Sequence, residues 1–381
     1  MHVKKKLIIF TGARSDYGLQ KNIIKELKKN KNVYLKILAG PDHFEKSFGT
    51  TYKEIIKDNL VIDYKIRNIN KKIKFNKKIS NLFSNFNTIN EKNNFDYAIL
   101  LGDRYETFLF AVSCYFNKIP IIHLYGGETT YGAIDESLRH SITKLSFYHF
   151  VSNEIHRKRV IQLGESPKNV FNFGYTGVEN FLTIKPQKKE NIFKKYKIYT
   201  KKKIVLVTFH PETISKISYK DQIKTLIQAI RNINSAYFIF NINNSDPGSE
   251  FFLKMINNLN LKYNNIKTIK SLGVNDYISF VNLSTLVIGN SSSGIIEVPY
   301  AGKPSINIGD RQQGRISKKT VVNVKLNSKE ITYQINKFLK KKINKNKKYK
   351  LVRSSKLISK KIISLINANK IAFKKKIFYD I

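Results

Sequence analysis

The stretch KLIIFTGARSDYG, residues 6–18, decides the fold class of this chain. It begins with a short run of apolar residues, which is typical of a strand that is covered on both faces. A turn containing Gly12 follows, and a helical pattern comes after the turn. Parallel α/β folds lead from a buried strand through such a turn into a covering helix. The segment therefore predicts the first strand and helix of a parallel sheet.

The same alternation continues along the chain in two series and predicts an α/β protein with parallel sheets. In the first series we expect strands at residues 6–10, 34–39, 97–101, 119–124 and 149–151. In the second series we expect strands at residues 203–209, 236–240, 266–269, 286–288 and 305–308. Helical patterns lie between them, such as residues 18–29 and 105–116.

A polar, lysine-rich stretch at residues 183–203 separates the two series and predicts a domain boundary. We therefore expect one domain over residues 1–183, a second over 200–355, and a C-terminal helix over 356–381 that packs back on the first domain. Residues 328–370 are expected to be helical, with Ser328 as the N-cap. Residues 68–94 are expected to form a helix with flanking loops.

The composition points to a globular enzyme of about two domains. Of the 381 residues, 41% are hydrophobic and 12% aromatic, which is enough for packed cores. The sequence has no apolar run near the ~20 residues that cross a bilayer. The apolar run at residues 7–10 is also too short for a secretion signal. The lone Cys114 fits a reducing compartment, so we expect a cytoplasmic protein.

A formal net charge of +42 raises the alternative of a nucleic-acid-binding protein. Lysine is spread along the whole chain together with asparagine and isoleucine, and no nucleic-acid-binding motif accompanies it. We therefore expect no nucleic-acid partner. The positive field would still speed the encounter with a dianionic nucleotide.

Polar residues follow the expected strands of the first half, where ligands of open parallel sheets bind. Gly12, Gly18 and Arg14 predict an anion site at a helix start, although a capped turn with a surface arginine would leave the same pattern. Asp103 follows the strand at 97–101 and is either a site carboxylate or an N-cap.

One glycine-rich loop, HLYGGETTYGAIDES, carries His123, Glu128 and Asp135, which is typical of an acid/base site. Arg139 and His140 come next, with a structural salt link as plausible as a functional role. We expect Glu106 and Glu136 to be solvated helix residues.

The second half repeats the pattern after its own strands. His210 follows the strand at 203–209, and GNSSSGIIE follows the strand at 286–288. Hydroxyl and N–H groups of the three serines and Gly294 can hold an anion, and Glu297 can accept hydrogen bonds from a ribose. Arg311 and Arg315 follow a further strand and suit a diphosphate.

Together, the motifs GDRYE, GGETTYGAIDES, RHSITK, VIQLGE, FHPET, NSDPG, GNSSSGIIE and NIGDRQQGR resemble those of the hydrolysing UDP-N-acetylglucosamine 2-epimerases. The resemblance runs in order from about Lys6 to Asn323. It implies two Rossmann-like domains of the glycosyltransferase-B type with the active site in the interdomain cleft. It also implies a UDP-sugar substrate, no metal and no other cofactor, and a homo-oligomer, either a dimer or a tetramer.

The resemblance also implies roles for individual residues. The carboxylates of Asp103 and Asp135 and the imidazole of His210 match catalytic groups. In some members of this family a catalytic glutamate stands where this chain has Tyr125, and in many bacterial members a glutamate stands where this chain has Tyr131. As a hypothesis we assign the role of the missing carboxylate to Glu128, and we expect Tyr125 and Tyr131 to face the sugar. The expected substrate-binding residues are Arg14, His43, Arg104, His123, Ser291, Ser292, Ser293, Gly294, Glu297 and Arg311.

The expected reaction eliminates UDP from UDP-N-acetylglucosamine (UDP-GlcNAc) and hydrates the resulting 2-acetamidoglucal to N-acetylmannosamine, for nonulosonic acid biosynthesis. Three enzymatic alternatives remain open. They are the same reaction on UDP-N,N'-diacetylbacillosamine, a non-hydrolysing epimerase that returns UDP-N-acetylmannosamine, and a glycosyltransferase that shares the fold.

Overall fold

The structure is a computed structural model that describes residues 4–46, 49–67, 74–131, 133–210, 212, 215–242, 254–256, 258, 263–269, 271–341, 349–368, 373 and 375–381. Contacts divide the chain into two compact units. The first contains Met1–Glu128, Asp135–Glu179 and Val352–Ile381, and the second contains Thr129–Ile134 and Asn180–Leu351. The C-terminal segment thus belongs with the first unit, and a short piece of the glycine-rich loop belongs with the second.

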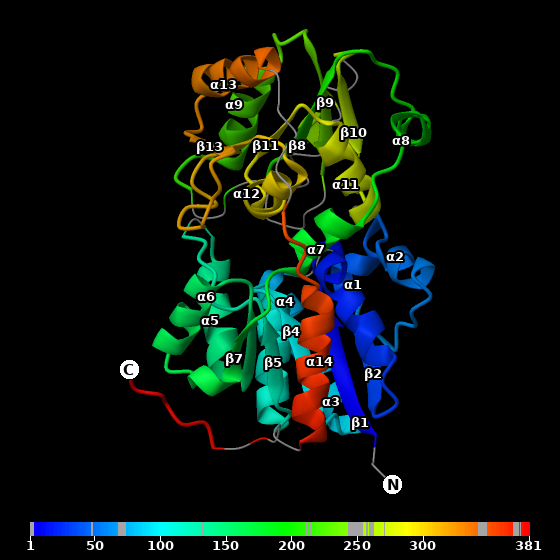
Figure 1. Cartoon of the computed structure of the whole chain (residues 1–381), viewed down its shortest axis with the longest axis vertical. Coiled ribbons are helices and arrows are strands. Elements are labelled where there is room, and N and C mark those ends of the chain that lie inside the picture. Colours follow the sequence, from blue (N-terminus) through cyan, green and yellow to red (C-terminus); the bar gives the residue numbers. More distant parts are fainter. Residues whose placement is uncertain are drawn as a thin grey trace. The chain divides into compact units, whose positions relative to one another are not determined.

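The first unit is built on a parallel sheet with strand order β3-β2-β1-β4-β5-β6-β7 (Figure 1). The chain runs outward from β1 to β3 and then returns to the other side of β1 with β4. This reversal places a topological switch point between β1 and β4, where open α/β sheets bind their ligands. The strands are β1 Lys5–Thr11, β2 Val33–Ala39, β3 Tyr64–Lys65, β4 Tyr97–Leu101, β5 Ile121–Leu124, β6 Tyr148–Val151 and β7 Val170–Asn172.

Helices cover both faces of this sheet because successive side chains of a strand point to opposite faces. Leu7 and Ile9 of β1 pack in one core with α1 and the C-terminal helix α14, which lie side by side in Figure 1. Ile8 and Phe10 pack in the other core with α3 and α4. The helices are α1 Arg14–Lys28, α2 Tyr52–Lys57, α3 Phe75–Asn93, α4 Tyr105–Phe116, α5 Asp135–Leu145, α6 Glu154–Gln162, α7 Thr176–Thr183 and α14 Ser354–Asn367.

The second unit repeats this plan with strand order β10-β9-β8-β11-β12-β13. All its paired strands are parallel, and its switch point lies between β8 and β11. The strands are β8 Lys203–Thr208, β9 Ala236–Asn241, β10 Ile266–Ile269, β11 Leu286–Gly289, β12 Ser305–Ile308 and β13 Val321–Val324. The described helices are α8 Lys189–Tyr196, α9 Tyr219–Ile230, α11 Val274–Leu283, α12 Ser292–Ile296 and α13 Ser328–Lys340. Each unit therefore has the strand order of a Rossmann fold.

Several expected elements need correction. The sequence missed β3, β7 and β13, which lie at sheet edges and have only two to four residues. Gly18 lies inside α1, which begins at Arg14, so it does not loosen the turn. The N-cap of α13 is Asn327 and not Ser328, because the Asn327 side chain accepts from the Glu330 N–H at 3.1 Å. The three missed strands, β3, β7 and β13, carry too few residues for a clear periodicity.

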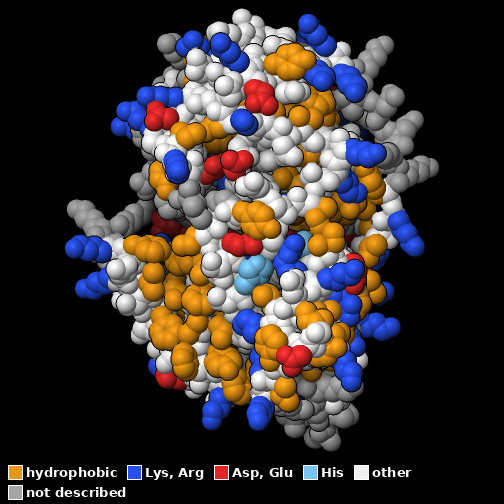
Figure 2. Space-filling model, turned by 90° about the vertical axis from the view of Figure 1, so that its left-hand side faces the viewer, with side chains coloured by type: hydrophobic (Ala, Val, Ile, Leu, Met, Phe, Trp, Pro, Cys, Tyr) orange, Lys and Arg blue, Asp and Glu red, His pale blue; other side chains and the backbone are white. Residues whose placement is uncertain are grey.

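The described part of the chain contains no helix that is both long enough and apolar enough to span a bilayer. On the face shown in Figure 2, lysine and arginine side chains are scattered among neutral and apolar ones and form no single stripe. This scatter matches the even spread of lysine along the sequence.

Candidate functional site

The turn after β1 is organised by Asp16. Its Oδ2 accepts hydrogen bonds from the N–H groups of Gly12 and Ala13, each at 3.1 Å. Burial raises the pKa of Asp16 to about 6. These two N–H groups are therefore occupied by a carboxylate of the protein. Arg14, at the start of α1, is the remaining anion-binding candidate of this turn.

Arg104 lies in a network of carboxylates at the end of β4. Its Nη2 donates to Asp42 Oδ2 at 2.6 Å and to Glu106 Oε1 at 3.1 Å. Burial opposes the charge, but Glu106 and Asp42 hold the pKa of Arg104 above its usual value. The prediction that Glu106 is solvated is wrong, since its side chain is 1% exposed. Arg104 thus joins Asp42 and Glu106 by hydrogen bonds at the end of β4.

His43 and His123, both expected to bind substrate, are buried. The ring of His43 lies between the hydroxyls of Thr11 and Thr51, at 3.1 and 3.0 Å. The Nε2 of His123 is 2.8 Å from the carbonyl oxygen of Gly102 and must donate to it. Burial lowers the pKa of His43 to about 4 and that of His123 to about 3. These contacts give both histidines a positioning role within the unit.

Arg139 joins the parts of the first unit that carry the expected catalytic carboxylates. Its side chain is 1% exposed, and its Nε donates to Asp103 Oδ2 at 3.0 Å, with Nη2 paired to the same oxygen. Its Nη1 donates to the Glu128 carbonyl oxygen at 2.9 Å and to Glu136 Oε2 at 2.7 Å. Glu136, which was expected to be solvated, keeps 23% of its side chain exposed and pairs with Arg139. An arginine on the same buried face of α5 as Ile142 and Thr143 was the signal for this role.

The glycine-rich loop is split between the two units. Glu128 is buried in the first unit, and Asp135 is the first residue of α5. Tyr125 does not face a sugar as predicted, because its ring is buried and its hydroxyl accepts from the Thr176 N–H at 3.0 Å. Tyr131 is 59% exposed and belongs to the second unit.

Asn290 organises the switch point of the second unit, a role that the sequence did not reveal. Its side chain accepts from the His210 N–H at 2.7 Å and donates to the His210 carbonyl oxygen at 2.8 Å. Its own carbonyl oxygen accepts from Gln312 Nε2 at 2.8 Å and from Arg311 Nη1 at 3.3 Å. Gly289 precedes it at φ +137°, where a Cβ would lie 2.1 Å from the Thr208 carbonyl oxygen. This close approach requires glycine.

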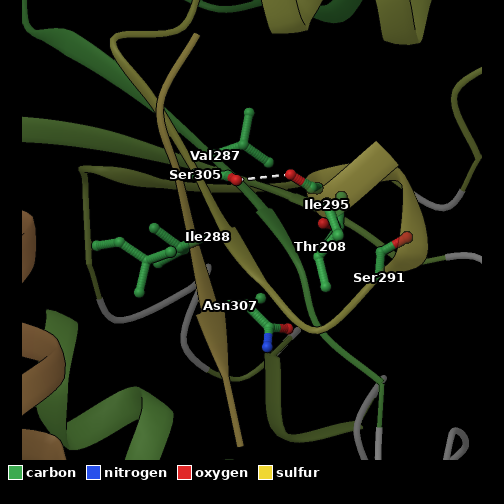
Figure 3. A pocket seen from close by; sticks show the side chains of 10 residues that line it. Thr208, Val287, Ile288, Ser291, Ile295, Ser305 and Asn307 are labelled. Atoms are coloured by element: carbon green, nitrogen blue, oxygen red, sulfur yellow. Dashed lines mark hydrogen bonds between the residues drawn. The ribbon is translucent and has the colours of Figure 1, made fainter. Parts of the chain in front are cut away.

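The serines follow Asn290 at the start of α12. Ser291 is the N-cap, and Ser293 Oγ accepts from the Tyr277 hydroxyl at 2.9 Å. Ser305 on β12 donates to the Gly294 carbonyl oxygen at 2.5 Å, which holds α12 against the sheet. A small pocket lies here, lined by residues of β8, β11, β12 and α12 (Figure 3). Glu297 is the C-cap residue of α12.

The loop that carries Arg311 is shaped by Glu212. The Glu212 carboxylate accepts from the N–H groups of Asp310 and Arg311 at 2.9 and 3.1 Å, and burial raises its pKa. Thr129 Oγ1 donates to the Gly314 carbonyl oxygen of the same loop at 2.7 Å. Parts of the quoted motifs, namely Gly132, Pro211 and residues 213–214 and 243–250, lie outside the described residues.

Comparison with known proteins identifies the family. The family model described as UDP-N-acetylglucosamine 2-epimerase matches residues 25–366. The chain belongs to the UDP-N-acetylglucosamine 2-epimerase family. A relative from Campylobacter jejuni, the GDP/UDP-N,N'-diacetylbacillosamine 2-epimerase (hydrolyzing), is 36% identical and covers 87% of each chain. Polysialic acid biosynthesis protein P7 of Escherichia coli is also 36% identical and covers 96% of this chain and 93% of its own.

Solved structures agree on the fold. The UDP-GlcNAc 2-epimerase of Neisseria meningitidis, solved with UDP-GlcNAc, matches with a TM-score of 0.77 at 17% identity, over 94% of this chain and 100% of that one. The predicted α/β fold of two Rossmann-like units of the glycosyltransferase-B type is therefore confirmed, as is the predicted family.

Proposed function

We propose that this epimerase is a hydrolysing enzyme that converts UDP-GlcNAc to N-acetylmannosamine and UDP. The observation that carries the proposal is the Arg139 cluster. One buried guanidinium holds the side chain of Asp103 and the backbone of Glu128, and it lies on the helix that Asp135 begins. This guanidinium links the Asp103 carboxylate to the backbone that carries Glu128, and positioned carboxylates are the groups that proton transfer at a sugar carbon needs.

The proposed chemistry has two steps. A carboxylate of the first unit takes the C2 proton, and the electron pair of the C2–H bond forms a C1=C2 double bond. At the same time the C1–O bond to UDP breaks, and its electron pair leaves with the diphosphate. Water then adds a hydroxyl to C1, and C2 receives a proton on the opposite face. We assign the exchange of the C2 proton to Glu128, Asp103 and Asp135.

We assign UDP to the second unit. Arg311 brings a positive charge next to Asn290 and the serines that follow it, which suits a departing diphosphate. His210 is fixed by the Asn290 side chain at the end of β8, next to the same groups. We assign Glu297 to the ribose hydroxyls, in line with the prediction from the sequence.

A second substrate, UDP-N,N'-diacetylbacillosamine, is favoured by one observation. The Campylobacter relative named for it is as similar to this chain as protein P7 is, at 36% identity in each case. The first substrate fits protein P7, which is named for polysialic acid biosynthesis, because the family resemblance implies that N-acetylmannosamine is made for sialic acid. Either product would feed the biosynthesis of a nonulosonic acid.

Proton NMR of the enzyme with each UDP-sugar in deuterated water tests this proposal. We expect UDP and free N-acetylmannosamine with deuterium at C2, with UDP-GlcNAc giving the higher kcat/KM. Accumulation of UDP-N-acetylmannosamine would show a non-hydrolysing epimerase instead. Turnover of the diacetylated sugar alone would move the assignment to that substrate.

A further inference from the structure

At the residue that precedes Glu128, the glycine-rich loop packs directly against helix α6. Gly127 has φ +78°, and a Cβ there would lie 2.5 Å from the carbonyl oxygen of His156 on α6. The backbone at Gly127 therefore touches the backbone of α6. A loop with so close a contact has little room to move when its neighbours are fixed.

Two arginines from two helices hold consecutive carbonyl groups of this loop. Arg159 on α6 donates from Nη1 to the Gly127 carbonyl oxygen at 2.5 Å. Arg139 on α5 donates from Nη1 to the Glu128 carbonyl oxygen at 2.9 Å. The first carbonyl belongs to the peptide plane before the Glu128 Cα, and the second belongs to the plane after it. Because the two planes flanking a Cα set its φ and ψ, they also set the direction of its Cβ.

We propose that Arg159 is a positioning residue for the reaction, acting through Glu128. It fixes the peptide plane before Glu128, so that the carboxylate keeps one direction toward the sugar. Hydrogen bonds from charged donors are stronger than neutral ones, and the planar guanidinium also restricts orientation. This inference rests on the proposed function, because it assigns Arg159 to a step in which Glu128 takes part.

Arg159 is a cleaner probe of this arrangement than Arg139. Arg139 also pairs with Asp103 and Glu136, so its replacement disturbs several carboxylates at once. Arg157 lies on the same helix and offers a matched control. Its guanidinium donates to Val170 O, Pro167 O and Glu154, away from the glycine-rich loop.

The experiment measures steady-state kinetics and UDP affinity for Arg159→Met and Arg157→Met. Methionine keeps an unbranched apolar stem and removes the guanidinium. We expect Arg159→Met to lower kcat by about 10- to 100-fold, as the loss of one charged hydrogen bond would. KM and the Kd for UDP should stay within about twofold, and Arg157→Met should match the wild type. A wild-type kcat in Arg159→Met would overturn the inference.

A double-mutant cycle with Glu128→Gln separates positioning from general damage. If Arg159 acts through Glu128, Arg159→Met should have little further effect in the Glu128→Gln background. An equal loss of kcat in both backgrounds contradicts the inference. Should Arg159→Met fail to fold, Arg159→Gln, which removes the charge and shortens the side chain, is carried through the same cycle with the same criteria. A wild-type enzyme without turnover would fail the proposed function in the same assay, before any variant is compared.

Discussion

The two units have the same strand order but hold different chemistry at their switch points. In the first unit the sheet edge carries buried charges, with Arg104 among Asp42 and Glu106, and with Arg139 between Asp103 and Glu136. In the second unit the edge is held by the neutral amide of Asn290, by hydroxyl and backbone groups, and by one carboxylate, Glu212, which binds backbone N–H groups. Fixed charges suit proton transfer, whereas neutral donors around a few arginines suit an anionic nucleotide. One strand order can therefore carry both the acid/base groups and the nucleotide site that we propose.

The largest expected effect comes from removing the carboxylate that we assign to proton exchange. Glu128→Gln should lower kcat by about 100- to 10,000-fold, because a positioned acid or base contributes that much. Loss of C2 deuterium incorporation, followed by NMR, checks this. Turnover close to wild type would remove Glu128 from the chemistry of the first unit.

The next largest effect is expected on the stability of the first unit, at the sheet edge that carries the buried charges. Arg139→Met leaves the carboxylates of Asp103 and Glu136 without their buried cation and should cost about 3–5 kcal/mol. Urea unfolding followed by fluorescence measures the loss, with the more exposed Arg157→Met as the control at about 1 kcal/mol or less. Equal losses in the two variants would mean that the buried charges do not set the stability of this edge.

A smaller effect on stability is expected at the switch point of the second unit, around Asn290. Asn290→Ala removes the two hydrogen bonds that fix His210 and should cost about 1–3 kcal/mol. The Kd for UDP, measured by calorimetry, should rise in this variant as the backbone around the serines loosens. A loss of stability larger than that of Arg139→Met would reverse the comparison between the two units.

The pH dependence of stability should belong mainly to the first unit. Burial lowers the pKa values of His43 and His123 to about 4 and 3. Below pH 6.5 the unfolded state therefore binds more protons than the folded state, and the free energy of unfolding decreases as the pH is lowered. Burial lowers the pKa of His149 in the same sense. Asp16 opposes this, because its raised pKa, about 6, lets the folded state bind a proton first.

The net expectation is a loss of about 2 kcal/mol in the first unit between pH 6 and pH 5. Hydrogen exchange with mass spectrometry resolves the two units and measures it. Faster exchange in the second unit than in the first over this range would contradict the assignment.

The fold was predictable because buried parallel strands are continuous apolar runs, which the sequence shows clearly for every strand except β3, β7 and β13. The carboxylates and serines were assigned to the candidate site because they follow those strands, and this assignment stays a prediction. Arg159 was not predictable, since its partner is a backbone carbonyl 32 positions away in the sequence. Asn290 was quoted in a motif, but its hydrogen bonds to His210 depend on β8 and β11 being neighbours. Glu106 was misplaced because the sequence does not show that Arg104 turns inward beside it.

We propose that proton transfer belongs to the first unit and nucleotide binding to the second. The most direct test compares the affinities of Glu128→Gln and Arg311→Ala for UDP by isothermal titration calorimetry. We predict that the Kd of Glu128→Gln for UDP stays within about twofold of wild type, and that Arg311→Ala binds UDP about tenfold more weakly, as loss of a charged contact would give. If Glu128→Gln weakened UDP binding as much as Arg311→Ala does, the separation of proton transfer from nucleotide binding would be wrong.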